Sequence, residues 1–271
     1  MTGEIWTLLG LNLLLLAVVL SVAAVPSFRT KDPSYIDGLW GLGFILLAVS
    51  SALQTDGDRG HTVLLVGITA VWGLRLSVYL FRRWRRNGPD ERYQKMLERN
   101  QGSDAVFLLT RVFLTQAVIL TVVALPVQLG QVYDHDLTAL NWVGAVVALF
   151  GIGFEATADA QLAAFKRDPG NKGQVMDRGL WGYSRHPNYF GEACVWWGLF
   201  LVALVNVPTA FAALGPLLIT VFLLRFSGVG PLEKQLKDSK PKYVDYIAST
   251  SGFVPLPKRD AAKVKREAGV S

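Results

Sequence analysis

The chain has 271 residues, of which 51% are hydrophobic and 18% are charged, and its formal net charge is +6. A soluble domain usually carries about 25% charged residues, and here the charges gather in clusters between apolar runs. Basic residues that flank apolar runs indicate an integral membrane protein rather than a nucleic-acid-binding protein. The single cysteine, Cys194, excludes an internal disulfide. The three scattered histidines lack the spacing of metal ligands, so we expect no metal site.

The apolar runs predict seven transmembrane helices, and the fold class is therefore an all-α, polytopic membrane protein. In chain order the predicted helices cover residues 5–25, 38–53, 62–81, 105–127, 140–165, 193–207 and 211–226. The first is expected to be a retained helix rather than a signal peptide, because Glu4 precedes it and no Lys or Arg does. We expect one membrane domain over residues 1–257 and a disordered basic tail over residues 258–271.

The distribution of basic residues predicts the orientation in the membrane. If the N-terminus lies outside, all 27 Lys and Arg residues except Arg59, Arg75 and Arg111 fall on the cytoplasmic side. We therefore predict an N-terminus outside, a cytoplasmic C-terminus and a multi-pass location in the cytoplasmic (inner) membrane. The polar segments 82–100 and 166–187 then share the cytoplasmic side with the tail, where soluble cofactors are found.

The most informative polar stretch is residues 182–192, which opens directly into an apolar run. Pro187 suits the first turn of a helix, so Asn188 and Glu192, four residues apart, share one helix face. Together with Arg185 and the histidine beside it, they predict a site for a polar, anionic ligand at a helix N-terminus. The alternative is a polar loop at the membrane interface, because positive-inside topology already requires basic residues there.

Ionisable residues inside predicted spans are costly and are therefore candidates for function. Glu155 and Asp159 share one face of the fifth span, and they need a cation such as Lys166, a proton or a ligand donor. Structural pairing of these carboxylates with Arg75 or another intramembrane arginine is the alternative. Tyr79, four residues after that arginine, is either an interfacial anchor or an acid.

Residues 151–156 match the loose dinucleotide fingerprint G-x-G-x-x-A. That motif binds a cofactor only between a strand and the start of a helix, whereas here it lies inside a continuous apolar helix. We therefore expect Gly151 and Gly153 to serve close packing between helices. The same role is predicted for Gly38, Gly41 and Gly43 of the second span.

Residues 179–181 (Gly-Leu-Trp) and 184–192 (Ser-Arg-His-Pro-Asn-Tyr-Phe-Gly-Glu) are similar to the C-terminal signature of the steroid 5-alpha-reductase family. The resemblance is closer to that family's bacterial branch, the DUF1295-type membrane proteins, known mainly as a domain of unknown function. It covers about residues 30–257, and the Arg-His-Pro-Asn-Tyr-Phe-Gly-Glu run is specific to this superfamily. Further matching stretches are residues 34–40, 72–79, 91–93, 232–233, 243, 246 and 253–255.

The resemblance implies a seven-helix reductase that binds NADPH in its cytoplasmic half and reduces a conjugated double bond of a membrane lipid or steroid-like substrate. By motif, Asn188 and Glu192 would hold the nicotinamide end of the cofactor. Tyr79, held by Asp37 or Arg75, would donate a hydrogen bond to the substrate carbonyl. The remaining cofactor residues implied by the resemblance are Glu155, Asp159, Lys166, Tyr183, Arg185, His186, Tyr189 and Trp196, with Arg225, Tyr243 and Tyr246 closing over the adenosine.

The chain departs from the steroid-reducing members in two respects. It lacks the adjacent Gln-Glu pair of their second span, since Gln54 is followed by Thr55, and Glu155 stands where the eukaryotic enzymes have an amide. The substrate is therefore open between a steroid-like molecule and another unsaturated lipid. Two other functions stay open: an S-adenosylmethionine-dependent methyltransferase of the isoprenylcysteine carboxyl type, and a non-enzymatic lipid-binding or transport protein. NADPH versus NADH, the proton donor and the oligomeric state do not follow from the sequence.

Overall fold

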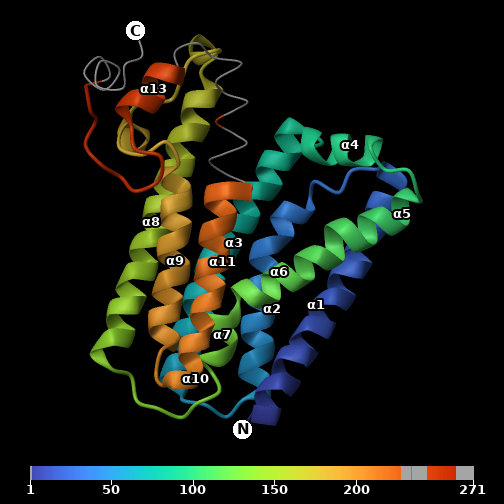
Figure 1. Cartoon of the computed structure of the whole chain (residues 1–271), viewed down its shortest axis with the longest axis vertical. Helices are drawn as coiled ribbons and strands as arrows, with labels where there is room; N and C mark the ends of the chain where they lie inside the picture. The colour runs from blue at the N-terminus through green and yellow to red at the C-terminus, as the bar shows by residue number, and fades with distance from the viewer. Residues whose placement is uncertain (1, 227–232, 234–242, 261–271) are drawn as a thin grey trace. The chain divides into compact units, whose positions relative to one another are not determined.

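The computed structural model describes residues 2–226, 233 and 243–260 (Figure 1). Regular structure in this part of the chain is helical, with one isolated bridge between Ser184 and Ser251. Of the predicted disordered tail, residues 261–271 lie outside the described residues. The helices of the first half are α1 (Thr2–Thr30), α2 (Ile36–Gln54), α3 (Arg59–Asn87), α4 (Glu91–Glu98), α5 (Asp104–Phe107), the π-helical η1 (Leu108–Leu114), α6 (Thr115–Val123) and α7 (Leu125–Leu129).

The second half continues with helices that carry most of the predicted site. They are α8 (Ala139–Arg167), η2 (Pro169–Asn171), η3 (Gly179–Gly182), α9 (Pro187–Ala203), α10 (Val207–Ala210), η4 (Phe211–Ala213), α11 (Leu214–Val221), η5 (Phe222–Phe226) and α13 (Tyr243–Ser249). The chain forms two compact units. Unit 1 comprises Met1–Ala145 and Leu199–Gly215, and unit 2 comprises Val146–Gly198 and Pro216–Ser271.

Six helical stretches of the described residues are long and apolar enough to cross a membrane, as expected for a multi-pass membrane protein. They are Gly3–Thr30, Ile36–Gln54, Arg59–Asn87, Asp104–Val123, Ala139–Arg167 and Val207–Arg225. The predicted sixth span corresponds to α9, whose 17 residues extend only about 26 Å at 1.5 Å per residue, against about 30 Å of bilayer hydrocarbon. The seventh crossing and the orientation of the termini therefore stay predictions.

Helices α2 and α3 of unit 1 pack at very short range. A Cβ atom added at Gly41 would overlap the carbonyl oxygen of Gly73. The close-packing role predicted for Gly41 is therefore confirmed. The rings of Phe44 and Trp72, both fully buried, lie 5.6 Å apart beside this contact. The α2–α3 pair thus forms the apolar centre of unit 1.

Three segments of unit 1 differ from the predicted spans. The first span does not end at residue 25 but continues through Pro26 to Thr30. The fourth span ends at Val123 rather than at residue 127, because Pro126 cannot supply a backbone N–H to a continuing helix and lies in the first turn of α7 instead. The third span extends to Asn87, where Gly88 adopts a left-handed φ of 74° and ends the helix. The short helix α4 then runs across this end of unit 1 (Figure 1).

Helices α8 and α9 meet through two glycines of unit 2. A Cβ at Gly151 would lie 2.6 Å from the carbonyl oxygen of Gly191, and a Cβ at Gly191 would lie 2.7 Å from the backbone nitrogen of Glu155. The packing role predicted for Gly151 is confirmed. The same prediction for Gly153 is wrong, because this glycine is exposed and no atom lies within 4 Å of its Cβ position. Residues two apart on a helix face different directions.

Candidate functional site

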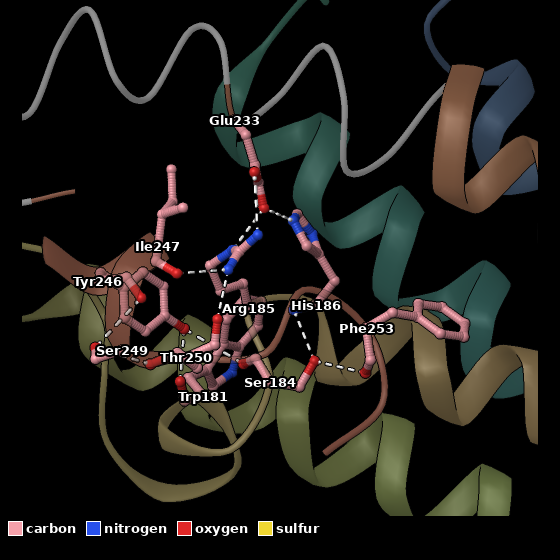
Figure 2. A network of polar contacts seen from close by, with 10 residues as sticks. All are labelled: Trp181, Ser184, Arg185, His186, Glu233, Tyr246, Ile247, Ser249, Thr250 and Phe253. Atoms are coloured by element: carbon pink, nitrogen blue, oxygen red, sulfur yellow. Dashed lines mark hydrogen bonds and ion pairs between the residues drawn. The ribbon is translucent and has the colours of Figure 1, made fainter. Parts of the chain in front are cut away.

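The signature stretch before α9 is tied to a segment that follows it by more than sixty residues (Figure 2). The Tyr246 hydroxyl donates to the carbonyl oxygen of Trp181 at 2.5 Å. Ser184 Oγ donates to the carbonyl oxygen of Phe253 at 2.8 Å and accepts the backbone N–H of His186 at 3.1 Å. These bonds hold the loop between η3 and α9 against α13 and the residues after it.

Arg185 is the centre of this network. Its Nε donates to Glu233 Oε1 at 2.7 Å, and its Nη2 donates to Oε2 of the same carboxylate at 3.3 Å. Its Nη1 donates to the carbonyl oxygens of Ile247, at 3.0 Å, and Thr250. Four of the five N–H groups of a guanidinium are thus used among the described residues. Arg185, predicted as a cofactor ligand, organises the loop and leaves one donor for a ligand.

Glu233 also contacts His186, whose Nε2 lies 3.3 Å from Oε1, and the imidazole stacks on the Tyr189 ring at 5.3 Å. Burial of the Glu233 carboxyl would raise its pKa, but the hydrogen bonds from His186 and Arg185 outweigh burial, so the pKa is lowered. Burial, reinforced by the Glu233 charge, raises the pKa of Tyr243 to about 12. Burial likewise raises the pKa of Tyr246. Both phenols therefore keep their protons.

A cavity of about 440 Å³ opens within unit 2 beside this network. Its lining comes from the basic segment at and after the end of α8, from the signature and from α13. Five predicted cofactor residues line the cavity together: Lys166, Arg185, His186, Tyr243 and Tyr246. Arg167, Asp168 and Lys172 also line the cavity. They belong to the turn of residues 166–172, whose sequence resembles a phosphate-binding surface, and positive-inside topology is the alternative reason for basic residues there. Phe165 and Trp181 are further lining residues that were not predicted.

The other predicted cofactor residues lie elsewhere in unit 2 and do not line this cavity. Glu155 and Asp159 are buried on α8, and Trp196 is buried on α9. Tyr183 and Arg225 are exposed. The half-buried residues are Asn188, Tyr189 and Glu192, all in the first two turns of α9. The structure therefore places Lys166, Arg185, His186, Tyr243 and Tyr246 at the cavity and the amide and carboxylate candidates along α8 and α9.

The predicted catalytic residues belong to unit 1. Arg75 and Tyr79 are half-buried on α3, and Asp37 lies in the first turn of α2. Asp37 accepts a hydrogen bond from the Tyr93 hydroxyl at 2.8 Å and from Arg92 Nη2 at 3.1 Å. The pKa of Tyr93 is raised well above its ordinary value by burial and by the Asp37 charge. Tyr93 of α4 was not among the predicted site residues, and its sequence signal is the family resemblance of residues 91–93.

The family comparison covers both of these clusters. The family described as "Protein of unknown function (DUF1295)" matches residues 23–250, and it is the family that includes steroid 5-alpha-reductase-like proteins. No curated protein and no solved structure matches the chain. The matched region contains Asp37 and its partners in unit 1, and the cavity-lining residues and the signature in unit 2.

Proposed function

The chain belongs to the DUF1295 family, and on that premise we propose that it is a membrane-embedded reductase that uses NADPH to reduce a conjugated double bond of a lipid. The proposal includes the closer relation to the bacterial branch of the steroid 5-alpha-reductase family, seven spans and a location in the cytoplasmic membrane. A steroid-like molecule or another unsaturated lipid would serve as the substrate. The alternative is a methyltransferase that binds S-adenosylmethionine in the same cavity.

The unit 2 cavity is the observation that carries the proposal. Its volume of about 440 Å³ falls in the range of about 300–1,000 Å³ typical of small-molecule sites. Lys166, Arg167 and Lys172 supply cations to the cavity lining, and such groups bind phosphates through charge-assisted hydrogen bonds. Tyr243 and Tyr246 supply aromatic surface, and Tyr243 adds a protonated hydroxyl. This combination suits the phosphates and adenosine of a dinucleotide.

The charge of the cavity distinguishes the two candidate cofactors. NADPH carries three phosphate groups, whereas S-adenosylmethionine carries a sulfonium and an ammonium group against a single carboxylate. These three cationic side chains, with Asp168 as the one acidic residue among the cavity's described lining residues, favour the anionic molecule. We therefore place the reductase before the methyltransferase.

The proposed reaction needs a hydride donor and a group that donates a hydrogen bond to the substrate carbonyl. NADPH would supply a hydride to the β-carbon of the conjugated ketone. A hydroxyl that donates a hydrogen bond to the carbonyl oxygen stabilises the negative charge of the enolate, and a proton delivered to the α-carbon completes the addition of two hydrogens. By the resemblance, Tyr79 is the residue expected in this role, whereas the Tyr93 hydroxyl is already engaged as a donor to Asp37 at 2.8 Å.

Titration of the purified protein in detergent tests the proposal. NADPH is expected to raise the thermal unfolding temperature, with a Kd in the micromolar range, and S-adenosylmethionine to leave it unchanged. Lys166→Ala with Lys172→Ala should weaken NADPH binding more than tenfold, because each charge-assisted hydrogen bond contributes about 1.5–3 kcal/mol. Cells that lack the protein should accumulate a lipid two hydrogens short of the normal one.

The matched control removes two exposed cations of unit 2 that do not line the cavity, Lys258 and Arg259. Lys258→Ala with Arg259→Ala should leave the NADPH affinity within about twofold, since exposed charges interact weakly through water. Equal losses in both double variants would argue against a specific cavity site. If only S-adenosylmethionine raised the unfolding temperature, the methyltransferase proposal would take the place of the reductase proposal.

A further inference from the structure

Two sets of basic residues stand out at the α3–α4 end of unit 1, of which the first is neutralised by neighbouring carboxylates. Lys31 and Lys95 are exposed and each forms one ion pair, while Arg92 is shared by two carboxylates. The pairs join Lys31 to Asp104 (2.8 Å), Lys95 to Glu91 (3.3 Å), and Arg92 to Asp37 (3.1 Å) and Asp90 (2.9 Å). These cations already have counterions within the protein.

The second set lies in the last two turns of α3. Arg82, Arg83, Arg85 and Arg86 are exposed, and no carboxylate of the described residues lies within ion-pairing distance of any of them. The spacing of three and four residues places Arg82, Arg85 and Arg86 on one helix face, whereas Arg83 lies about 100° around the helix from Arg82. The partial charge of the helix C-terminus, about half an elementary charge, is too small to balance three guanidinium groups.

The rotation of α3 at this end is set by Trp84. Its indole Nε1 donates to Asp32 Oδ2 at 3.0 Å, and its ring packs edge-on against Tyr35 at 5.8 Å. At about 100° per residue, Trp84 points roughly opposite to Arg82 and Arg86. The tryptophan therefore faces its neighbours in unit 1, and the arginine face points outward.

The same outward face of α3 is apolar further along the helix. Val71, Leu74 and Val78 are 57%, 52% and 46% exposed, and the helix repeat aligns them with the arginine face. An exposed apolar stripe on a membrane-spanning helix contacts lipid chains. The three arginines continue this stripe at the end of the span, which is the level of the lipid headgroups.

We propose that Arg82, Arg85 and Arg86 bind the phosphate of an anionic phospholipid whose acyl chains lie along Val71, Leu74 and Val78. Guanidinium groups donate paired hydrogen bonds to phosphate oxygens. The site stands on charge, exposure and helix geometry, and it does not depend on the reductase proposal. It commits to a lipid phosphate rather than a soluble one, because the apolar stripe leads directly into it.

The full chain, purified in detergent, can be titrated with phosphatidylglycerol, phosphatidylcholine and soluble glycerol phosphate while its thermal unfolding temperature is measured. Phosphatidylglycerol should raise this temperature more than the other two. Arg82→Gln with Arg86→Gln should weaken the apparent affinity for phosphatidylglycerol about tenfold or more, because each basic residue at an anionic surface contributes a factor of about five. Arg82→Lys with Arg86→Lys should give an intermediate loss, since charge is kept and paired hydrogen bonds are lost.

The control removes the same number of charges from paired cations of the same region. Lys31→Gln with Lys95→Gln should leave the response to phosphatidylglycerol nearly unchanged, because these cations are held by Asp104 and Glu91. Equal losses in the two double variants would show a response to net charge only and overturn the site. So would an equal shift with glycerol phosphate, or no preference of the unmodified chain for phosphatidylglycerol.

Discussion

The carboxylate of Glu233 joins the signature to a region of the chain 47 residues away, through Arg185 and His186 (Figure 2). Its side chain is only 12% exposed, so the guanidinium and the imidazole screen it from water. Removing the carboxylate would leave the Arg185 guanidinium partly buried without its counterion, and this is the main cost of breaking such a pair. The function of Arg185 in holding α13 therefore depends on the Glu233 charge.

Glu233→Gln is expected to destabilise the protein by about 1–3 kcal/mol near pH 7, because hydrogen bonds to charged groups are replaced by a weaker amide contact. The pKa of Glu233 is lowered by folding from its ordinary value of 4.5. Its stabilisation is thus complete above that value and is lost as the pH falls through the lower, folded-state pKa. Thermal unfolding measured from pH 7 down to acid should show the difference between variant and unmodified chain shrinking.

Asp177→Asn is the matched control, because it breaks an exposed pair with Lys258 at 3.3 Å in the same unit. That pair should contribute less than about 1 kcal/mol. If Glu233→Gln lowered the unfolding temperature no more than Asp177→Asn, the described network would not stabilise the loop.

At the scale of elements, the contact between α8 and α9 fixes the position of the buried carboxylate face of α8. Gly191→Ala would place a Cβ 2.7 Å from the backbone nitrogen of Glu155, so the helices must separate. Overpacking of this kind costs about 1–3 kcal/mol, and we expect a lower unfolding temperature. Gly153→Ala meets no atom within 4 Å and should be neutral or stabilising by up to about 1 kcal/mol, since alanine favours helix. Equal stability of the two variants would contradict the tight α8–α9 contact.

Elements with strong local signals were predictable from the sequence. Long apolar runs gave the spans, and Pro187 correctly marked the first residue of α9. Short helices such as α4 and α13 were missed, because eight or fewer residues carry too little periodicity. The paired role of Arg185 could not be foreseen, since its partners Glu233 and Thr250 are distant in the sequence and only the fold brings them together.

At the scale of the whole molecule, the topology depends on whether α9 crosses the bilayer. If α9 did not cross, residues on both sides of it would share one face of the membrane. The span Val207–Arg225 would then deliver the Lys-rich segment that follows it to the outside. That arrangement violates the positive-inside rule, whereas a crossing satisfies it, and 17 residues are the lower limit for a transmembrane helix. We therefore predict that α9 crosses.

Cysteine labelling in intact cells tests this crossing, in a chain whose own cysteine is removed by Cys194→Ser. Val207→Cys, at a position 79% exposed, should react with a membrane-impermeant maleimide, as should His135→Cys in the loop before α8. Asp177→Cys, in the exposed loop before α9, should react only after the membrane is permeabilised. Protection of Val207→Cys together with Asp177→Cys would mean that α9 stays on one side. Labelling of Asp177→Cys alone would show the opposite orientation to the predicted one, because the basic loops would then lie outside.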